Sequence, residues 1–207
     1  MVGMGLGLGL GLGNRRSTPS NISNGGPELL LQTEILHRGD KTVEGVLVRA
    51  VAIPWLEIVQ HLNRDASFLF QFVKNPRKFE EFIAASYERA GFDEIVLTPQ
   101  RGDGGRDVIA TKNGWGSVRF LEQTKAYSPG HLVTHDDVRA ILGALSTDQK
   151  ASKALITTTS DFQPGILKAD SEFAAFVPHR LELKNGTKTL EWIRSIAPAE
   201  GGSTHGA

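Results

Sequence analysis

The 207-residue sequence contains no cysteine, and its 23 Lys and Arg residues balance its 23 Asp and Glu residues. The lack of cysteine excludes disulfides and thiolate metal sites, and it fits a reducing, cytoplasmic location. The lack of net charge means that no global electrostatic field attracts nucleic acid, although a local basic patch remains possible. No apolar run reaches the roughly 18 residues that a membrane-spanning helix needs, so we expect no membrane partner.

The length and composition of the chain suit one globular domain with additional short segments. The 22.4 kDa chain is 40% hydrophobic and 22% charged, which is ordinary for such a domain. By itself this composition also fits a generic cytosolic domain.

Both ends differ from the rest. Residues 1–27 alternate Gly and Leu and then turn rich in Ser, Asn, Pro and Gly, while residues 198–207 are short and Gly-rich. A secretory signal has its positive charges before the apolar run, but Arg15 and Arg16 follow it here. We interpret both ends as disordered tails, with a short membrane-touching peptide as the alternative for the first.

Residues 28–75 read as a small accessory segment rather than a second domain. Two β-rich runs, 29–36 and 43–53, flank an expected turn at 37–41. Pro54 is placed to open a helix, and residues 67–73 read as another short helix.

Residues 76–197 alternate strands and helices, which predicts an α/β fold with a mixed sheet flanked by helices on both faces. Thr134 and Asp137 form a near capping box at the start of the helix after the third strand, and Ser160 with Gln163 resembles another. The expected helices span 76–90, 134–147, 161–173 and 188–196, and the expected strands span 94–98, 106–111, 117–125, 154–158 and 180–183.

Two glutamates on the first of these helices are separated by helical geometry. At about 100° per residue, Glu80 lies about 20° from Tyr87, at the rim of the apolar stripe, whereas Glu81 is predicted to point to solvent. Glu80 can therefore reach a site, although a solvated helix charge is the commoner role for such a residue.

One aspartate lies within the glycine turn at 102–105, and another follows it. Asp103 precedes a glycine and suits a turn residue, whereas Asp107 opens the apolar run Val108–Ala110. A carboxylate there is costly unless it is paired or binds a metal. Asp107 is therefore the stronger candidate.

The next strand carries Gln123 and Lys125 on one face and Glu122 on the other, because strand side chains alternate. A bulge would reverse the roles of Gln123 and Glu122. His131 and His135 have the i, i+4 spacing of a zinc-protease helix, but they straddle an expected turn and lack its glutamate. The glycine turn lacks the Gly-Lys-Ser/Thr of a phosphate-binding loop.

Taken in order, these residues resemble the catalytic domain of Mrr-type restriction endonucleases, within the PD-(D/E)xK nuclease superfamily, in its QxK variant. The resemblance lacks the cationic residue that usually follows the motif lysine, where this chain has Ala126. The matching segments are Pro76–Phe82, Ala90–Phe92, Thr98–Pro99, Gly102–Ala110, Gln123–Tyr127 and Ile156–Ser160.

The resemblance implies a restriction-endonuclease-like fold and a Mg²⁺-dependent endonuclease acting on double-stranded DNA, with Mn²⁺ as a substitute. Asp107, Gln123, Glu80 and the Thr124 carbonyl would hold the metal, and Lys125 would orient or deprotonate the attacking water and stabilise charge on the phosphate. Surface cations are weak candidates for phosphate contacts. These cations are Arg101, Arg106, Lys112, Lys150, Lys153 and Lys168.

Three functional hypotheses remain open at this point. The first is an endonuclease that restricts foreign or modified DNA. The second is a catalytically weak DNA-binding subunit of a defence complex, and the third is a structure-specific repair nuclease or junction resolvase. A homodimer and further restriction-system subunits are possible partners.

Overall fold

The computed structural model describes residues 30–100 and 105–198. The tail predicted at 1–27 lies wholly outside these residues, as does the tail predicted at 198–207 except for residue 198. So do Arg101 and Asp103 of the glycine turn.

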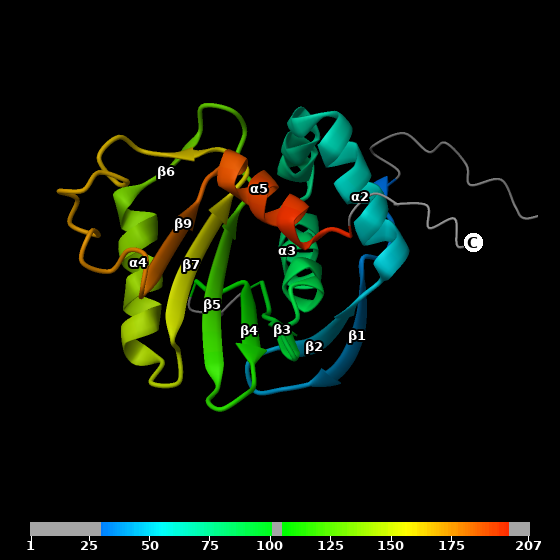
Figure 1. The fold of residues 1–207 in the computed structure, drawn as a ribbon, viewed down its shortest axis with the longest axis horizontal. Coiled ribbons are helices and arrows are strands. Elements are labelled where there is room, and N and C mark those ends of the chain that lie inside the picture. Colours follow the sequence, from blue (N-terminus) through cyan, green and yellow to red (C-terminus); the bar gives the residue numbers. More distant parts are fainter. Residues whose placement is uncertain (1–29, 101–104, 199–207) are drawn as a thin grey trace, which may run out of the picture.

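A seven-stranded sheet runs through the molecule in the order β1-β2-β3-β4-β5-β7-β9 (Figure 1). Neighbours from β1 to β5 are antiparallel, while β5, β7 and β9 are parallel. The predicted mixed sheet is thus confirmed. Its strands are β1 (Leu36–Lys41), β2 (Val46–Ala50), β3 (Glu94–Leu97), β4 (Val108–Lys112), β5 (Val118–Lys125), β7 (Lys153–Thr158) and β9 (Leu181–Lys184).

Helices cover both faces of the sheet, as predicted (Figure 1). One face carries α4, and the other carries α2, α3 and α5 together with a 3₁₀ helix, η1. The helices are α2 (Ala52–Arg64), η1 (Ala66–Lys74), α3 (Pro76–Arg89), α4 (His135–Thr147) and α5 (Gly186–Ile196).

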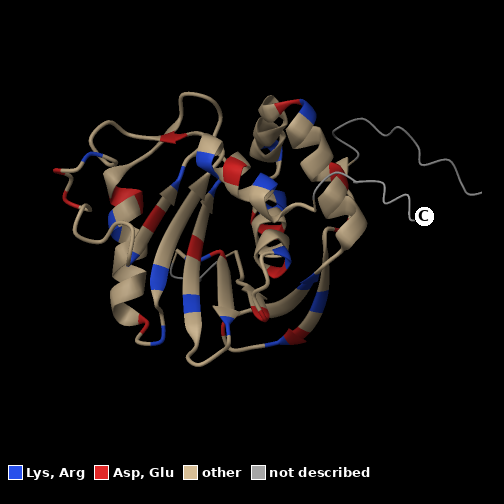
Figure 2. Ribbon diagram, in the orientation of Figure 1, with Lys and Arg blue, Asp and Glu red and all other residues tan. Residues whose placement is uncertain are grey.

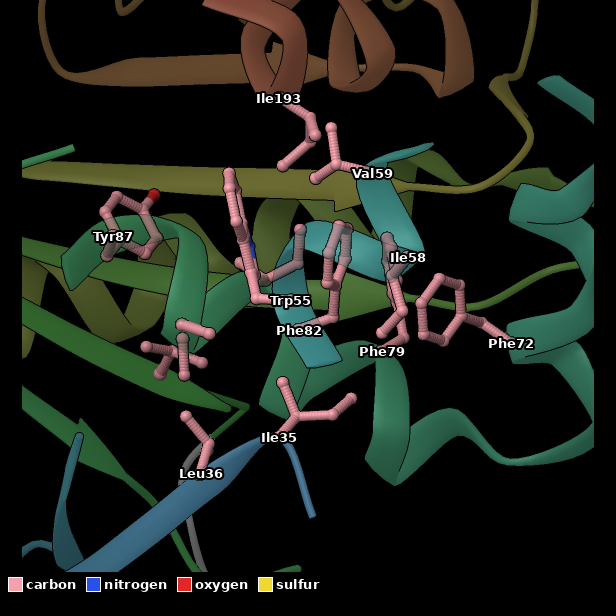
Figure 3. Close-up of a cluster of buried hydrophobic side chains, with 14 of the residues drawn as sticks. Ile35, Leu36, Trp55, Ile58, Val59, Phe72, Phe79, Phe82, Tyr87 and Ile193 are labelled. Atoms are coloured by element: carbon pink, nitrogen blue, oxygen red, sulfur yellow. The ribbon is translucent and has the colours of Figure 1, made fainter. Parts of the chain in front are cut away.

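Successive side chains of β4 point to opposite faces of the sheet, and the core accordingly has two layers. Val108 and Ala110 pack with α3, whereas Ile109 packs with α4. The α3 layer is rich in aromatic rings, and Figure 3 shows side chains from β1, α2, η1, α3 and α5 converging there. The Trp55 indole N–H donates to the Ser86 hydroxyl at 3.0 Å, so its polar group is satisfied inside this core.

The turn predicted at residues 37–41 is wrong, because these residues form β1 and the chain reverses at Thr42–Gly45. The Thr42 hydroxyl accepts the backbone N–H of Gly45 at 3.1 Å, which stabilises a turn after the strand. A Cβ at Gly45 would lie 2.3 Å from the Leu97 carbonyl oxygen, so the tight approach of β2 to β3 requires glycine. The hairpin from residues 28–75 therefore belongs to the same sheet as the rest of the chain.

The helix predicted at 161–173 is also wrong. Residues Asp161–Phe162 form a short strand, β8, which pairs in parallel with β6 (Leu132–Val133). The backbone N–H of Gln163 continues this pairing by donating to the Val133 carbonyl at 2.9 Å. Gly165 then adopts a left-handed φ of 100°, which interrupts a helix, and turns continue to β9.

The capping box predicted at Thr134 and Asp137 is present at the start of α4. The Asp137 N–H donates to the Thr134 hydroxyl at 3.2 Å, and the Asp137 carboxylate accepts the Thr134 N–H at 2.9 Å. Of the helices in the described ranges, none is long and apolar enough to cross a membrane.

Candidate active site

Asp107 lies just before β4, where β4 and β5 stop pairing through their backbones. The last backbone pair joins Val108 to Glu122, and the Asp107 N–H donates to the Glu122 carbonyl at 2.9 Å. Beyond it, the Asp107 carboxylate accepts the Thr124 N–H at 2.6 Å and the Thr124 hydroxyl at 3.2 Å. Where the two strands diverge, the Asp107 carboxylate thus takes the place of a backbone carbonyl as the acceptor of the Thr124 N–H.

Gln123 is nearly buried beside Asp107, with 8% of its surface exposed. Its side-chain oxygen, Oε1, is buried and has no hydrogen-bond partner among the described residues. Gly105, with a φ of 78°, packs closely against the other end of the carboxamide, since a Cβ there would lie 3.3 Å from Nε2. The carboxamide therefore offers an unsatisfied acceptor, which is costly unless something binds it.

Lys125 ends β5 on the α4 face of the sheet. Its ammonium forms an ion pair of 2.8 Å with the Asp137 carboxylate and lies 5.9 Å from the centre of the Tyr127 ring. Burial alone would lower the pKa of Lys125, but the hydrogen bond to Asp137 and the nearby acidic groups raise it overall. Burial would likewise raise the pKa of Asp137, but Lys125 and Thr134 lower it.

Glu122 points to the opposite face, as predicted from strand alternation. The Tyr87 hydroxyl of α3 donates to its carboxylate at 2.5 Å, and the side chain is fully buried. Burial raises the pKa of Glu122, against the opposing effects of Lys184 and Tyr87. Because Glu122 contacts α3 while Lys125 contacts α4, the two side chains do not share a site.

The prediction that Glu81 points to solvent is wrong. Glu81 is 7% exposed and its carboxylate lies 2.7 Å from the Lys78 ammonium and 3.5 Å from the Arg38 guanidinium. Helical periodicity misplaced it because α3 is packed on more than one side, and the charge of Glu81 is balanced by the largely buried Lys78 and by the exposed Arg38. Glu80 lies on the first turns of α3, largely buried, and pairs with Arg77.

The donors in this region fit a hard divalent cation. Asp107 provides a carboxylate, and Gln123 provides a buried oxygen that lacks a partner. The carbonyl of Thr124 points to the same side of β5 as its N–H, toward Asp107, as in any extended strand. Oxygen donors of this kind suit Mg²⁺ or Mn²⁺. Among the described residues no three His, Asp or Glu side chains are grouped to hold a metal.

Four of the candidate phosphate-contacting cations that the structure describes, Lys112, Lys150, Lys153 and Lys168, do not gather around Asp107. Lys112 lies at the far end of β4, where its ammonium donates to the Gly91 carbonyl at 3.0 Å. Lys153 begins β7, at the opposite end from Lys125, and pairs with Glu182 at 2.8 Å. Lys150 is exposed after α4, and Lys168 is exposed in the turns that precede β9.

Arg106, the neighbour of Asp107, forms an ion pair of 3.6 Å with Asp148. Both line a cavity of about 470 Å³ together with Glu44 and Lys150, and Asp107 is not among the described residues that line it. Across the described elements, basic and acidic residues are interspersed (Figure 2). The structure thus gives no single basic face on the part of the chain that it describes.

Sequence reasoning missed Asp137 and Tyr87 as partners of site residues. Asp137 was recognised only as a cap, although a capping carboxylate has a second oxygen that is available to a neighbour. Tyr87 was assigned to the apolar stripe, although a buried tyrosine usually needs a partner for its hydroxyl.

Comparisons with known proteins bear on these residues. The chain matches the Mrr_cat family, described as restriction endonuclease, over residues 74–193. This range includes Glu80, Asp107, Gln123 and Lys125. No curated protein matches the chain.

Two solved structures resemble the fold at low sequence identity. The DNA modification-dependent restriction endonuclease AspBHI is 20% identical, with a TM-score of 0.45, over 68% of this chain and 34% of its own. The MspJI restriction endonuclease, in complex with a 27-mer oligonucleotide, is 17% identical, with a TM-score of 0.43, over 70% of this chain and 32% of its own. The match thus spans about a third of each of these proteins. On the family match, which covers more than half of its length, the chain belongs to the Mrr catalytic-domain family of restriction endonucleases.

Proposed function

We propose that the protein is a metal-dependent DNA endonuclease that hydrolyses phosphodiester bonds and restricts foreign or modified DNA in the cytoplasm. The observation that carries this proposal is the grouping of three different polar functions where β4 and β5 diverge. They are the Asp107 carboxylate, the unpartnered Gln123 oxygen and the Lys125 ammonium.

Asp107, Gln123 and the Thr124 carbonyl would hold Mg²⁺, and Glu80 is the further proposed ligand, directly or through water. When bound, the cation would polarise a phosphoryl oxygen and lower the pKa of its water. The buried position of Gln123 supports this role, because a cation would satisfy an acceptor that otherwise has no described partner.

Lys125 would orient the attacking water and stabilise negative charge that develops on the phosphate. Its position two residues beyond Gln123 keeps both side chains on one face of β5. An ammonium has three donors, so the ion pair with Asp137 leaves others for a phosphate oxygen or a water. Preorganised charge of this kind is effective because it needs no reorganisation during the reaction.

A second candidate function is DNA binding without efficient cleavage, as a subunit of a larger assembly. The neutral carboxamide at position 123 favours it, because it leaves one fewer negative charge for a cation than the commoner carboxylate would. A third candidate, a structure-specific nuclease, differs from the first in the DNA that it cuts.

A cleavage assay separates these functions. Methylated plasmid, unmethylated plasmid and a four-way junction would each be incubated with Mg²⁺, Mn²⁺ or EDTA. We expect plasmid cleavage with either metal and none with EDTA. Preferential cleavage of the junction would favour the structure-specific nuclease, and binding of all substrates without cleavage would favour the binding subunit.

A further inference from the structure

Asp137 occupies an unusual position between the helix α4 and the lysine of β5. One oxygen of its carboxylate, Oδ2, accepts the Thr134 N–H at 2.9 Å and the Thr134 hydroxyl at 2.8 Å. The other oxygen, Oδ1, lies 2.8 Å from the Lys125 ammonium. The two oxygens therefore have separate roles, one in the helix cap and one in the ion pair.

The capping box fixes the direction of this carboxylate. The Thr134 hydroxyl also accepts the Asp137 N–H at 3.2 Å, so side chain and backbone are bound reciprocally. Val138, the next residue, is fully buried against the sheet and anchors this turn of α4. Little additional conformational freedom is lost when Asp137 binds Lys125, which makes the ion pair more favourable than one between two mobile side chains.

Lys125 is restrained from two directions as a result. Asp137 binds its ammonium from α4, and the Tyr127 ring lies 5.9 Å away on the segment after β5. Tyr127 is itself stacked on His131, with ring centres 4.0 Å apart. A long side chain that would otherwise sample many rotamers is thus held on the α4 face, the face it shares with Gln123.

We propose that Asp137 is a positioning residue that holds the Lys125 ammonium in place for phosphodiester cleavage. This inference rests on the proposed function, because it assigns Asp137 a role in the same site. Asp137 acts through Lys125 and does not itself contact the DNA.

Asp137→Asn tests the proposal, with Asp136→Asn as its matched control. Asparagine retains an oxygen that can accept the Thr134 N–H, so α4 keeps its cap but Lys125 loses its anionic partner. Asp136 is also in the first turn of α4, but it is exposed and pairs with Arg139 at 2.6 Å. Both substitutions remove one negative charge from the same helix end, but only Asp137→Asn removes the anionic partner of Lys125.

We expect Asp137→Asn to lower the kcat of plasmid cleavage by about tenfold or more, with KM and the melting temperature close to those of wild type. Asp136→Asn should leave all three unchanged. Asp137→Glu, which restores the anion on a longer stem, should recover part of the loss. Wild-type or faster turnover by Asp137→Asn would overturn the proposal, since it would mean that the ion pair is dispensable or inhibitory.

A second measurement does not depend on activity. In ¹⁵N spectra of lysine ammonium groups, the Lys125 signal is identified by its disappearance in Lys125→Arg. We expect this signal to be sharp in wild type and in Asp136→Asn and to be lost in Asp137→Asn through faster proton exchange. An unchanged signal in Asp137→Asn would overturn the proposal, whereas absence of cleavage by wild-type protein with every metal and substrate would instead refute the proposed function on which it rests.

Discussion

The Asp107 carboxylate accepts the backbone N–H of Thr124 at 2.6 Å, across the point where β4 and β5 diverge. This contact fixes the aspartate against the strand that carries Gln123 and Lys125. The pairing of β4 with β5 therefore determines which residues come together in the candidate site.

Substitutions at Gln123 test whether its buried oxygen binds the metal. Gln123→Ala should reduce cleavage by about 2–4 kcal/mol of transition-state stabilisation, as the loss of one preorganised polar group can. Gln123→Glu should retain Mg²⁺-dependent cleavage, and its melting temperature should rise with added Mg²⁺ more than that of wild type, because the metal would offset a buried charge.

Glu122→Gln is the control for this pair, because Glu122 contacts Tyr87 on the other face. Cleavage kinetics should stay close to wild type. If Glu122→Gln abolished cleavage while Gln123→Ala had no effect, the assignment of the two faces of β5 would be wrong.

Substitutions at the two adjacent glutamates of α3 should differ in their effects on DNA cleavage and on the stability of the fold. Glu80→Gln should lower cleavage more than Glu81→Gln does. Glu81→Gln should instead destabilise the fold by about 1–3 kcal/mol, because it leaves the Lys78 ammonium without its buried partner. Urea unfolding and plasmid cleavage measured on both variants check this, and the reverse ranking would exclude Glu80 from the site.

The pH dependence of stability should report on Glu182 of β9. Burial would raise its pKa, but Lys184 and Lys153 lower it overall. A carboxyl whose pKa is lower in the folded state adds stability above its unfolded pKa, and this stability is lost as pH falls through the folded pKa. Glu182→Gln should therefore cost about 0.2–1 kcal/mol at pH 7, because the side chain is partly exposed, and much less at pH 3.

Glu191→Gln, at an exposed position of α5, is the control for this measurement. It should change the free energy of unfolding less than Glu182→Gln at pH 7. A cost at Glu182 that grew as the pH fell would contradict the assigned direction of its pKa.

Gly45→Ala tests whether the N-terminal hairpin is integral to the sheet. The added Cβ would meet the Leu97 carbonyl oxygen at 2.3 Å, so β2 and β3 would have to separate. We expect a loss of about 1–3 kcal/mol in the free energy of unfolding. Gly116→Ala, where nothing lies within 4 Å, should cost less, and equal stability of the two variants would contradict this packing.

The sequence was sufficient to predict the main helices and strands between residues 76 and 158 and the opposite faces of Glu122 and Lys125. Both follow from local periodicity, which depends on neighbours in the chain. The prediction failed for Glu81 and for residues 161–173, because their environments come from distant segments. Arg38 and Lys78 make the burial of Glu81 possible, and pairing with β6 converts a helix-like segment into β8.

Local sequence patterns also could not predict which residues contact the site residues. Asp137 and Lys125 are separated by a loop and a short strand, and only the packing of α4 on the sheet brings them to 2.8 Å. The capping box predicted where α4 starts, but not what its second oxygen would bind.

The most direct test of the central claim is cleavage of supercoiled plasmid by Asp107→Asn, compared with wild type and Lys125→Ala. Asparagine can still accept the Thr124 N–H, so the strands should keep their arrangement while the carboxylate charge is lost. We predict that Asp107→Asn remains folded, loses at least about a hundredfold in cleavage rate and binds Mg²⁺ more weakly in calorimetry, whereas Lys125→Ala loses cleavage but binds Mg²⁺ like wild type. Wild-type cleavage by folded Asp107→Asn would contradict the assignment of the active site.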